Sequence, residues 1–165
     1  MVAHGWGYFF ETSAALVVLM LSIPRISVDY VFETFSYTQN TIETAIKEII
    51  WLSTNNDFYK PRLGSFLKVL LSYYPKFRLR DPTGTLIEAI KGRSNNVESL
   101  LEHGLAEVTD EAFEALIDLW VPPEEDEEEI RRIQEVTYKI LIKYGKKPSK
   151  ESRVGKMLQG LLRDL

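Results

Sequence analysis

The sequence predicts an all-α protein, a compact bundle of eight or nine short helices forming one domain over residues 1–165. Apolar residues recur at the three- and four-residue spacing of helices along most of the chain. Prolines, glycines and capping residues divide this pattern into short segments. The 165 residues, of which 45% are hydrophobic and 27% charged, suffice for one domain with its own core.

The first helix is expected in the segment TSAALVVLMLS, which begins at the capping residues Thr12 and Ser13 and stops before Pro24. Because it is apolar on all sides, we expect it at the centre of the fold. It is shorter than the roughly 20 residues that cross a bilayer, and no basic residue precedes it as in a signal peptide. Burial is therefore favoured over insertion into a membrane.

The next two segments lie before residue 56. SVDYVFETF is either a helix capped by Ser27 or a strand, because β-branched and aromatic residues are dense in it. As a helix it would share one face among Tyr30, Val31 and Phe35. NTIETAIKEIIWL is a clearer helix, in which Glu43 and Lys47 are spaced as a favourable ion pair. Its inner stripe consists of Ile42, Ala45, Ile46, Ile49 and Ile50.

Further helices are expected between residues 59 and 104. Pro61 stands near the start of the first, and Pro75 ends it. Its inward positions are Leu63, Phe66, Leu67, Leu70 and Leu71. DPTG is predicted to be a turn, and the helices TLIEAIKG and NNVESLLEHG are predicted to end at Gly92 and Gly104.

The helix TDEAFEALIDLW is expected to begin at the cap Thr109 and to end before Pro122 and Pro123. A sub-boundary near residues 121–123 would separate the main bundle from a C-terminal helical hairpin. The first helix of this hairpin has Ile130, Ile133, Val136, Ile140, Leu141 and Tyr144 on one face. The second has Val154, Met157, Leu158, Leu161, Leu162 and Leu165 in register.

Charge is segregated along the chain, whose net charge is −4. Residues 58–80 contain six basic residues and no acid, and residues 139–165 contain eight basic residues against two acids. Residues 94–130 contain thirteen acids and no Lys or Arg. The two basic blocks are a candidate surface for phosphate groups, because Lys and Arg release condensed counterions from nucleic acid.

The candidate nucleic-acid-binding residues lie near helix ends, where connections expose them. They are Lys60, Arg62, Lys76, Arg78, Arg80, Lys146, Lys147 and Lys150. The candidates for stacking on bases are Tyr59, Tyr73, Tyr74 and Phe77. Such a surface would bind RNA or single-stranded DNA without strong sequence preference. In the alternative, the aromatic residues pack in the core and the basic residues form its solvated rim.

Nothing in the sequence indicates a catalytic residue, a metal site or a cofactor. The chain has no cysteine, which excludes disulfides and thiolate zinc sites and fits the cytoplasm. His4 and His103 are its two histidines, and a helix C-terminus accounts for His103. The acids of residues 124–129 suit a helix start and pair with Arg131 and Arg132, although they could also dock a basic partner. An enzyme built on scattered carboxylates is a third class of function.

The stretch from Ser13 to Ile50 resembles the start of the small subunit of archaeal type I-A CRISPR effector (Cascade) complexes. The shared features are an apolar first helix, the aromatic connector VDYVFETFSYTQN and a helix rich in isoleucine and charge. The resemblance implies a non-catalytic subunit that contacts nucleic acid and neighbouring subunits in antiviral defence. We therefore expect a cytoplasmic subunit of a nucleoprotein assembly, with protein partners, self-association and no membrane. The alternative is a helical protein–protein adaptor or regulator without a nucleic-acid role.

Overall fold

The computed structural model describes residues 27–34, 38–55, 62–93, 96–119, 124 and 126–161. In these residues the chain forms eight helices and no strand, so the predicted all-α fold is confirmed. The helices are α2 (Val28–Thr34), α3 (Gln39–Asn55), α4 (Arg62–Tyr73), α5 (Pro82–Lys91), α6 (Asn96–Glu102), α7 (Asp110–Ile117), α8 (Glu127–Tyr144) and α9 (Arg153–Leu161). The predicted apolar helix TSAALVVLMLS lies outside the described residues.

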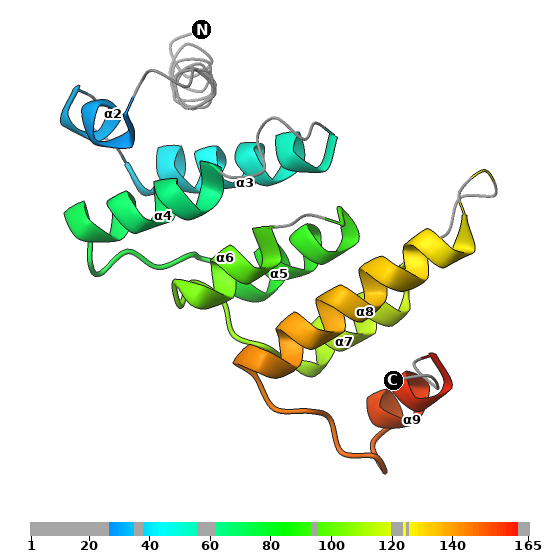
Figure 1. Cartoon of the computed structure of the whole chain (residues 1–165). Helices are drawn as coiled ribbons and strands as arrows, with labels where there is room; N and C mark the ends of the chain where they lie inside the picture. The colour runs from blue at the N-terminus through cyan, green and yellow to red at the C-terminus, as the bar shows by residue number, and fades with distance from the viewer. Residues whose placement is uncertain are drawn as a thin grey trace, which may run out of the picture.

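The helices are stacked as antiparallel pairs in two layers (Figure 1). One layer contains α3, α5, α7 and α9, each packed on the next, and the other contains α2, α4, α6 and α8 in the same way. Between the layers, α3 packs on α4, α5 on α6 and α7 on α8. Each helix therefore packs mainly on its neighbours along the stack, which is the arrangement of helical-repeat solenoids.

Similar buried residues recur from helix to helix along the stack. Leu70 of α4, Leu100 of α6 and Leu141 of α8 each lie near the C-terminal end of their helix and have no exposed surface. In the other layer, a buried alanine is followed by a buried isoleucine or leucine in α3, α5 and α7. These pairs are Ala45–Ile46, Ala89–Ile90 and Ala115–Leu116. The small alanine side chains allow neighbouring helices to approach closely.

The predicted inward faces of α3 and α4 are confirmed. All five stripe residues of α3 are buried, as are Leu63, Phe66, Leu67 and Leu70 of α4, and Leu71 is half-buried. The ambiguous segment SVDYVFETF contains a helix, α2, which ends at Thr34. Tyr30 of this helix is 52% exposed, whereas Val28 is buried.

The buried face of α8 differs from the predicted one. Its buried residues are Ile130, Gln134, Tyr138 and Leu141, whereas Val136 is 58% exposed. Gln134 is buried because its Nε2 donates a hydrogen bond to the Leu116 carbonyl of α7, at 3.2 Å. The Tyr138 ring meets the edge of Phe113 with 6.3 Å between ring centroids. The prediction counted aliphatic residues and so missed two amphipathic side chains that bridge α7 and α8.

The C-terminal helices are tied to the rest of the stack through α7, because α8 and α9 both pack against it. In α9 the predicted core residues Val154 and Leu158 are buried, but Met157 is 38% exposed. Leu162 and Leu165 lie outside the described residues. No described helix is long and apolar enough to cross a membrane.

Helix ends mostly follow the predicted signals. Gly92 caps the end of α5, and Gly104 follows α6 with a φ of 69°, a conformation that glycine adopts at little cost. DPTG, however, begins α5 instead of forming a separate turn. The Asp81 carboxylate accepts a hydrogen bond from the Gly84 N–H at 2.9 Å, and Pro82 is the first helical residue.

Candidate functional site

The connection between α4 and α5 carries three of the candidate basic residues. Lys76, Arg78 and Arg80 are exposed, whereas the intervening Phe77 and Leu79 are 6% and 7% exposed and belong to the core. Extended backbone turns successive side chains to opposite sides, and this alternation produces one inner and one outer row. The outer row is therefore basic because of the sequence order KFRLR.

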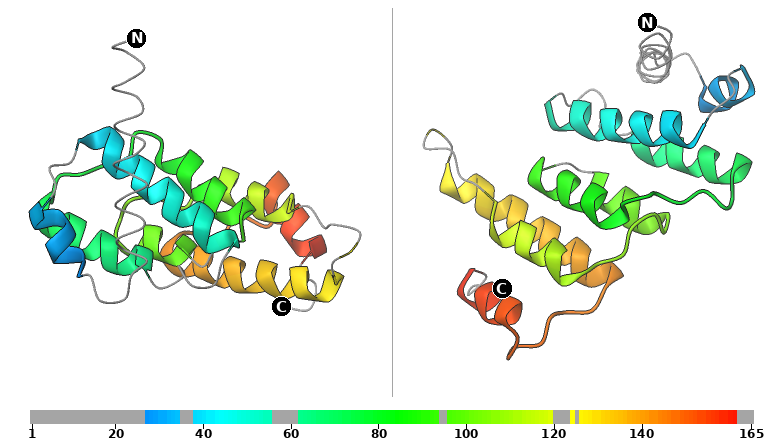
Figure 2. Two further views of the ribbon diagram at one scale, coloured as in Figure 1. Left: turned by 90° about the horizontal axis from the view of Figure 1, so that it is seen from above. Right: turned by 180° about the vertical axis from the view of Figure 1, so that it is seen from behind.

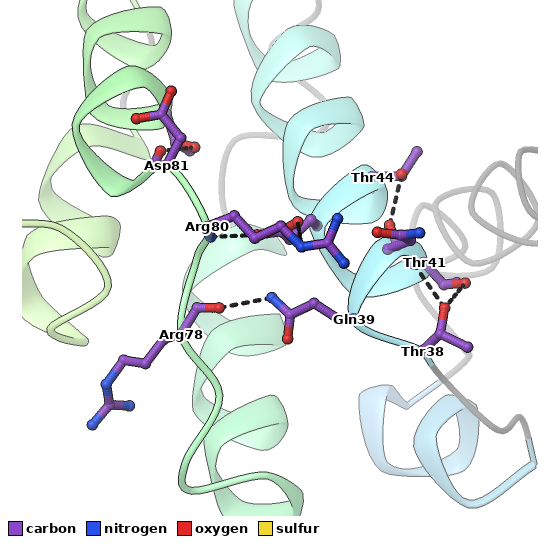
Figure 3. Close-up of polar contacts among 10 residues, drawn as sticks. Thr38, Gln39, Thr41, Thr44, Arg78, Arg80 and Asp81 are labelled. Atoms are coloured by element: carbon purple, nitrogen blue, oxygen red, sulfur yellow. Dashed lines mark hydrogen bonds and ion pairs between the residues drawn. The ribbon is translucent and has the colours of Figure 1, made fainter.

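Two side chains of α3 hold this connection in place (Figure 3). Gln39 Nε2 donates to the Arg78 carbonyl at 2.7 Å, and Glu43 Oε1 accepts the Arg80 N–H at 2.6 Å. Glu43 Oε2 also lies 3.6 Å from Arg80 Nε, an ion pair that takes the place of the predicted one with Lys47. These two hydrogen bonds could not be predicted from the sequence, because each joins residues nearly forty positions apart along the chain.

Arg78 and Arg80 differ in how free their charges are. The Arg78 side chain points away from α3, and its Nη1 donates to the Phe77 carbonyl at 2.7 Å (Figure 3). The Arg80 guanidinium turns toward α3 and is partly neutralised by Glu43, so it has less charge to offer a phosphate. Among the residues of this connection, Lys76 and Arg78 are the stronger candidates.

The aromatic candidates near this connection also differ in their exposure. Tyr73 and Tyr74 are 42% and 38% exposed, and the Tyr73 hydroxyl donates to Glu33 Oε1 at 3.3 Å. Phe77 is buried and offers no ring face to a base, so the prediction that it stacks is corrected. Tyr59 and Lys60 lie outside the described residues.

Arg62 does not lie beside the other basic candidates of its block. It is the first residue of α4, a helix of 12 residues, and the connection with Lys76 follows the opposite end of that helix. At a rise of 1.5 Å per residue these two ends are about 18 Å apart. The basic segment that is continuous in sequence is thus divided between the two sides of the stack.

The connection between α8 and α9 carries the remaining candidates, Lys146, Lys147 and Lys150, all exposed. Ser152 fixes its end, because its Oγ donates to the Ser149 carbonyl at 2.7 Å and accepts the Gly155 N–H at 3.0 Å. A side chain at position 155 would collide with the Ser149 carbonyl, so glycine allows α9 to begin directly against this connection.

A groove that the sequence did not reveal lies beside this connection. Its volume is about 290 Å³. Its wall contains four apolar or aromatic residues, Tyr138, Ile142, Pro148 and Leu158, and three basic ones, Lys139, Lys147 and Lys150. We call this the lysine groove. The only sequence signal for it was the basic composition of residues 139–156, because its walls come from two helices and a connection.

The two basic connections lie on the same side of the stack, with the connection between α6 and α7 between them (Figure 2). The six candidates of these two connections thus form two groups on one side, whereas Arg62 lies at the other end of α4. The acidic start of α8 lies at the other end of that helix from Lys146 and Lys147. Acids also lie on the side of the basic connections, since the exposed Glu107 belongs to the α6–α7 connection and the exposed Asp110 begins α7.

The acidic run serves the start of α8, as predicted. Asp126 caps the helix by accepting the Glu128 N–H at 3.0 Å, and Glu127, Glu128 and Glu129 fill its first turn. Glu128 Oε1 lies 3.2 Å from Arg132 Nη2, one of the predicted pairs. Among the described residues, no group of three His, Asp or Glu side chains is placed to share a metal ion.

One charged cluster joins α6 and α8, which are neighbours within one layer. Lys143 Nζ lies 2.9 Å from Glu98 Oε1, and the Tyr144 hydroxyl donates to the same oxygen at 3.2 Å. The hydrogen bond from Lys143 lowers the pKa of Glu98, and the same bond raises the pKa of Lys143. Lys143 also lies 5.1 Å from the centre of the Tyr144 ring, a cation–π geometry.

Comparison of the chain with protein-family models, with curated proteins and with solved structures found no match.

Proposed function

We propose that the protein is a non-catalytic helical scaffold that binds another protein, as an adaptor or subunit of a larger assembly in the cytoplasm. The two-layer stack of helical pairs carries this proposal. In such a stack each pair adds exposed surface without enlarging a central core, and proteins of this architecture use that surface for binding. α8 and α9 expose large apolar side chains on it, namely Val136, Ile142 and Met157.

The positions of the basic residues favour this function over nucleic-acid binding as the main role. Arg62 lies at the opposite end of α4 from Lys76, Arg80 is paired with Glu43, and Phe77 is buried. A continuous phosphate-binding face would need the basic residues together and free, and stacking on bases would need an exposed ring. The charge pattern supplies instead two small basic connections on one side and an acidic helix start on the other.

Affinity purification of the full chain from its own cells tests the proposal. The eluate is treated with nuclease and then separated by size-exclusion chromatography with mass spectrometry. A partner protein that remains in fixed ratio after nuclease treatment is the expected result. A chain that elutes alone with and without nuclease treatment contradicts the proposal.

A second candidate function is contact with a nucleic-acid backbone, including a place in a CRISPR effector complex as a small subunit. The shared side of the two basic connections supports it (Figure 2). This candidate requires binding to single-stranded RNA or DNA that is indifferent to sequence and steeply dependent on salt.

Fluorescence anisotropy with labelled single strands over a salt series tests the second candidate. Changing Lys76, Arg78 and Lys147 together to Gln is expected to lower the log–log salt slope by about 0.7 per lost phosphate contact. The control changes Lys47 and Lys68, which are exposed on α3 and α4 away from the connections, to Gln. Equal slopes for both variants, or no binding at low salt, contradict the second candidate.

A further inference from the structure

The lysine groove combines an apolar floor with a basic rim. Tyr138 and Leu158 are 8% and 5% exposed and close the bottom, while Ile142 is 36% exposed and forms an accessible wall. A volume of about 290 Å³ lies at the lower end of the range for small-molecule sites, roughly 300–1,000 Å³. The groove therefore has room for an inserted aliphatic side chain but not for a folded element.

The rim of the lysine groove is positively charged, and no acidic side chain neutralises it among the described residues. Lys139, Lys147 and Lys150 are exposed, and no Asp or Glu is among the described residues that line the groove. Within the described part of the chain, no ion pair engages any of these three lysines. Their charges are available to an incoming anion, and because they come from α8 and the following connection they surround the apolar floor.

The groove is held in shape before anything binds. Ser152 joins the α8–α9 connection to the start of α9 through its two hydrogen bonds, and buried Gly155 allows that helix to lie against the Ser149 carbonyl. Leu158 of α9 is buried in the core. A site whose walls are fixed in advance loses little conformational freedom on binding.

We propose that the lysine groove binds an acidic peptide segment of a partner protein, which inserts one aliphatic side chain between flanking carboxylates. This inference rests on the proposed scaffold function and names the chemistry of its partner at one site. The rim matches the carboxylates by charge, and the floor matches the aliphatic side chain by size and polarity. A nucleic-acid backbone would use the rim but would leave the apolar floor empty, and no aromatic face is exposed there for a base.

The proposal is tested with a fluorescein-labelled peptide of sequence EDLEDE by anisotropy on the full chain. Changing Lys147 and Lys150 to Glu is expected to weaken binding at least about tenfold, because attractive charge pairs become repulsive. The matched control changes Lys146 and Lys156 to Glu; both are exposed nearby, but neither lines the groove. The control is expected to weaken binding by less than about threefold, because these two lysines attract the peptide only at long range, where salt screens the interaction.

A second pair of variants, both on α8, tests the apolar part of the groove. Ile142→Ser removes a side chain of the groove wall, and Val136→Ser removes one that is exposed elsewhere on the helix. We expect Ile142→Ser to weaken peptide binding about fivefold or more, and Val136→Ser to leave it unchanged. Replacing the leucine of the peptide by serine should reproduce the loss and should abolish the difference between the two variants.

Several results would overturn the inference. These are absence of peptide binding, equal losses in the groove and control variants, or a groove that binds labelled RNA at least as tightly as the peptide. Self-association of the protein that Ile142→Ser abolishes would show that a second copy fills the groove. Tighter peptide binding by a chain ending at Leu161 would show that the chain's own last residues fill it.

Different experimental results would contradict the scaffold function and the groove inference. If a partner protein co-purifies and stays bound to the Ile142→Ser variant and to the Lys147 and Lys150 variant, the groove inference fails and the scaffold function stands. If the wild-type chain purifies alone but binds the peptide through the groove, the acidic-peptide chemistry stands and the scaffold function fails.

Discussion

The helices α4, α6 and α8 each have a fully buried leucine near the C-terminal end. The same substitution can therefore be made at three places along the stack. Leu70, Leu100 and Leu141 have no exposed surface, so changing each to Ala removes three carbon atoms from the core. At about 0.8 kcal/mol per buried methylene the transfer loss is about 2.4 kcal/mol. A residual cavity raises the cost to about 3–4 kcal/mol of unfolding free energy.

For a chain of this length such a loss lowers Tm by roughly 6–16 °C. Calorimetry or urea denaturation measures the loss, and Val136→Ala is the matched control, because that side chain is 58% exposed on α8. The control should change stability by no more than about 0.5 kcal/mol. A control loss as large as that of Leu141→Ala would refute the assignment of the buried face of α8.

The pattern of hydrogen exchange tests the stack itself. Helices that pack mainly on their neighbours lose protection locally, so Leu141→Ala should open α8 and α9 while α3 and α4 keep their protection. Leu70→Ala should give the reverse pattern, and Leu100→Ala should affect both sides of the centre. If all three variants lower protection equally in every helix, the chain unfolds as one cooperative unit and the nearest-neighbour reasoning is wrong.

Three further predictions concern single contacts. Asp81→Ala removes the cap of α5 and should lower the unfolding free energy by about 1 kcal/mol in urea denaturation; an unchanged midpoint would show that the cap contributes nothing. Gly155→Ala should lower Tm, because its Cβ would collide with a backbone carbonyl, whereas Gly160→Ala on the same helix meets open space and should raise it; the opposite order would contradict the α9 geometry. Because the pKa of Glu98 is lowered in the folded state, its contribution to stability is present above its unfolded pKa, near 4.5, and is lost as pH falls through the folded value. The Tm gap between wild type and Glu98→Gln should therefore be open at neutral pH and should close as the pH falls through the folded pKa, and a gap that persists in stronger acid would exclude the ion pair with Lys143 as its source.

The individual helices could be predicted because their signals are local. The stripe of α3 from Ile42 to Ile50 repeats at helical spacing, and Gly92 and Gly104 stand at helix ends that the structure confirms. The stacking could not be predicted in the same way. Leu70 and Leu100 are 30 residues apart, whereas Leu100 and Leu141 are 41 residues apart. No fixed period therefore marks these recurring leucines in the sequence.

The candidate site was harder to predict, because its properties depend on contacts between distant segments. Phe77 was expected in an exposed segment after Pro75, and the sequence alone cannot show that extended backbone turns this ring inward. Gln134 was not among the residues predicted on the apolar face of its helix, yet the Leu116 carbonyl allows its burial. The charge blocks were visible in composition, but only the fold shows that Arg62 and Lys76 lie at opposite ends of one helix.

The charge distribution along α8 has a consequence for how the molecule moves toward other charged bodies. This helix of 18 residues spans about 27 Å, with acids in its first turn and lysines in and after its last turns. In the field of a charged surface this helix experiences a torque, which favours its lysine end toward a negatively charged surface and its glutamate end toward a positive one. Despite a net charge of −4 it should therefore be retained by cation- as well as anion-exchange resins, and this double retention should vanish at salt concentrations that shorten the screening length to a few ångströms.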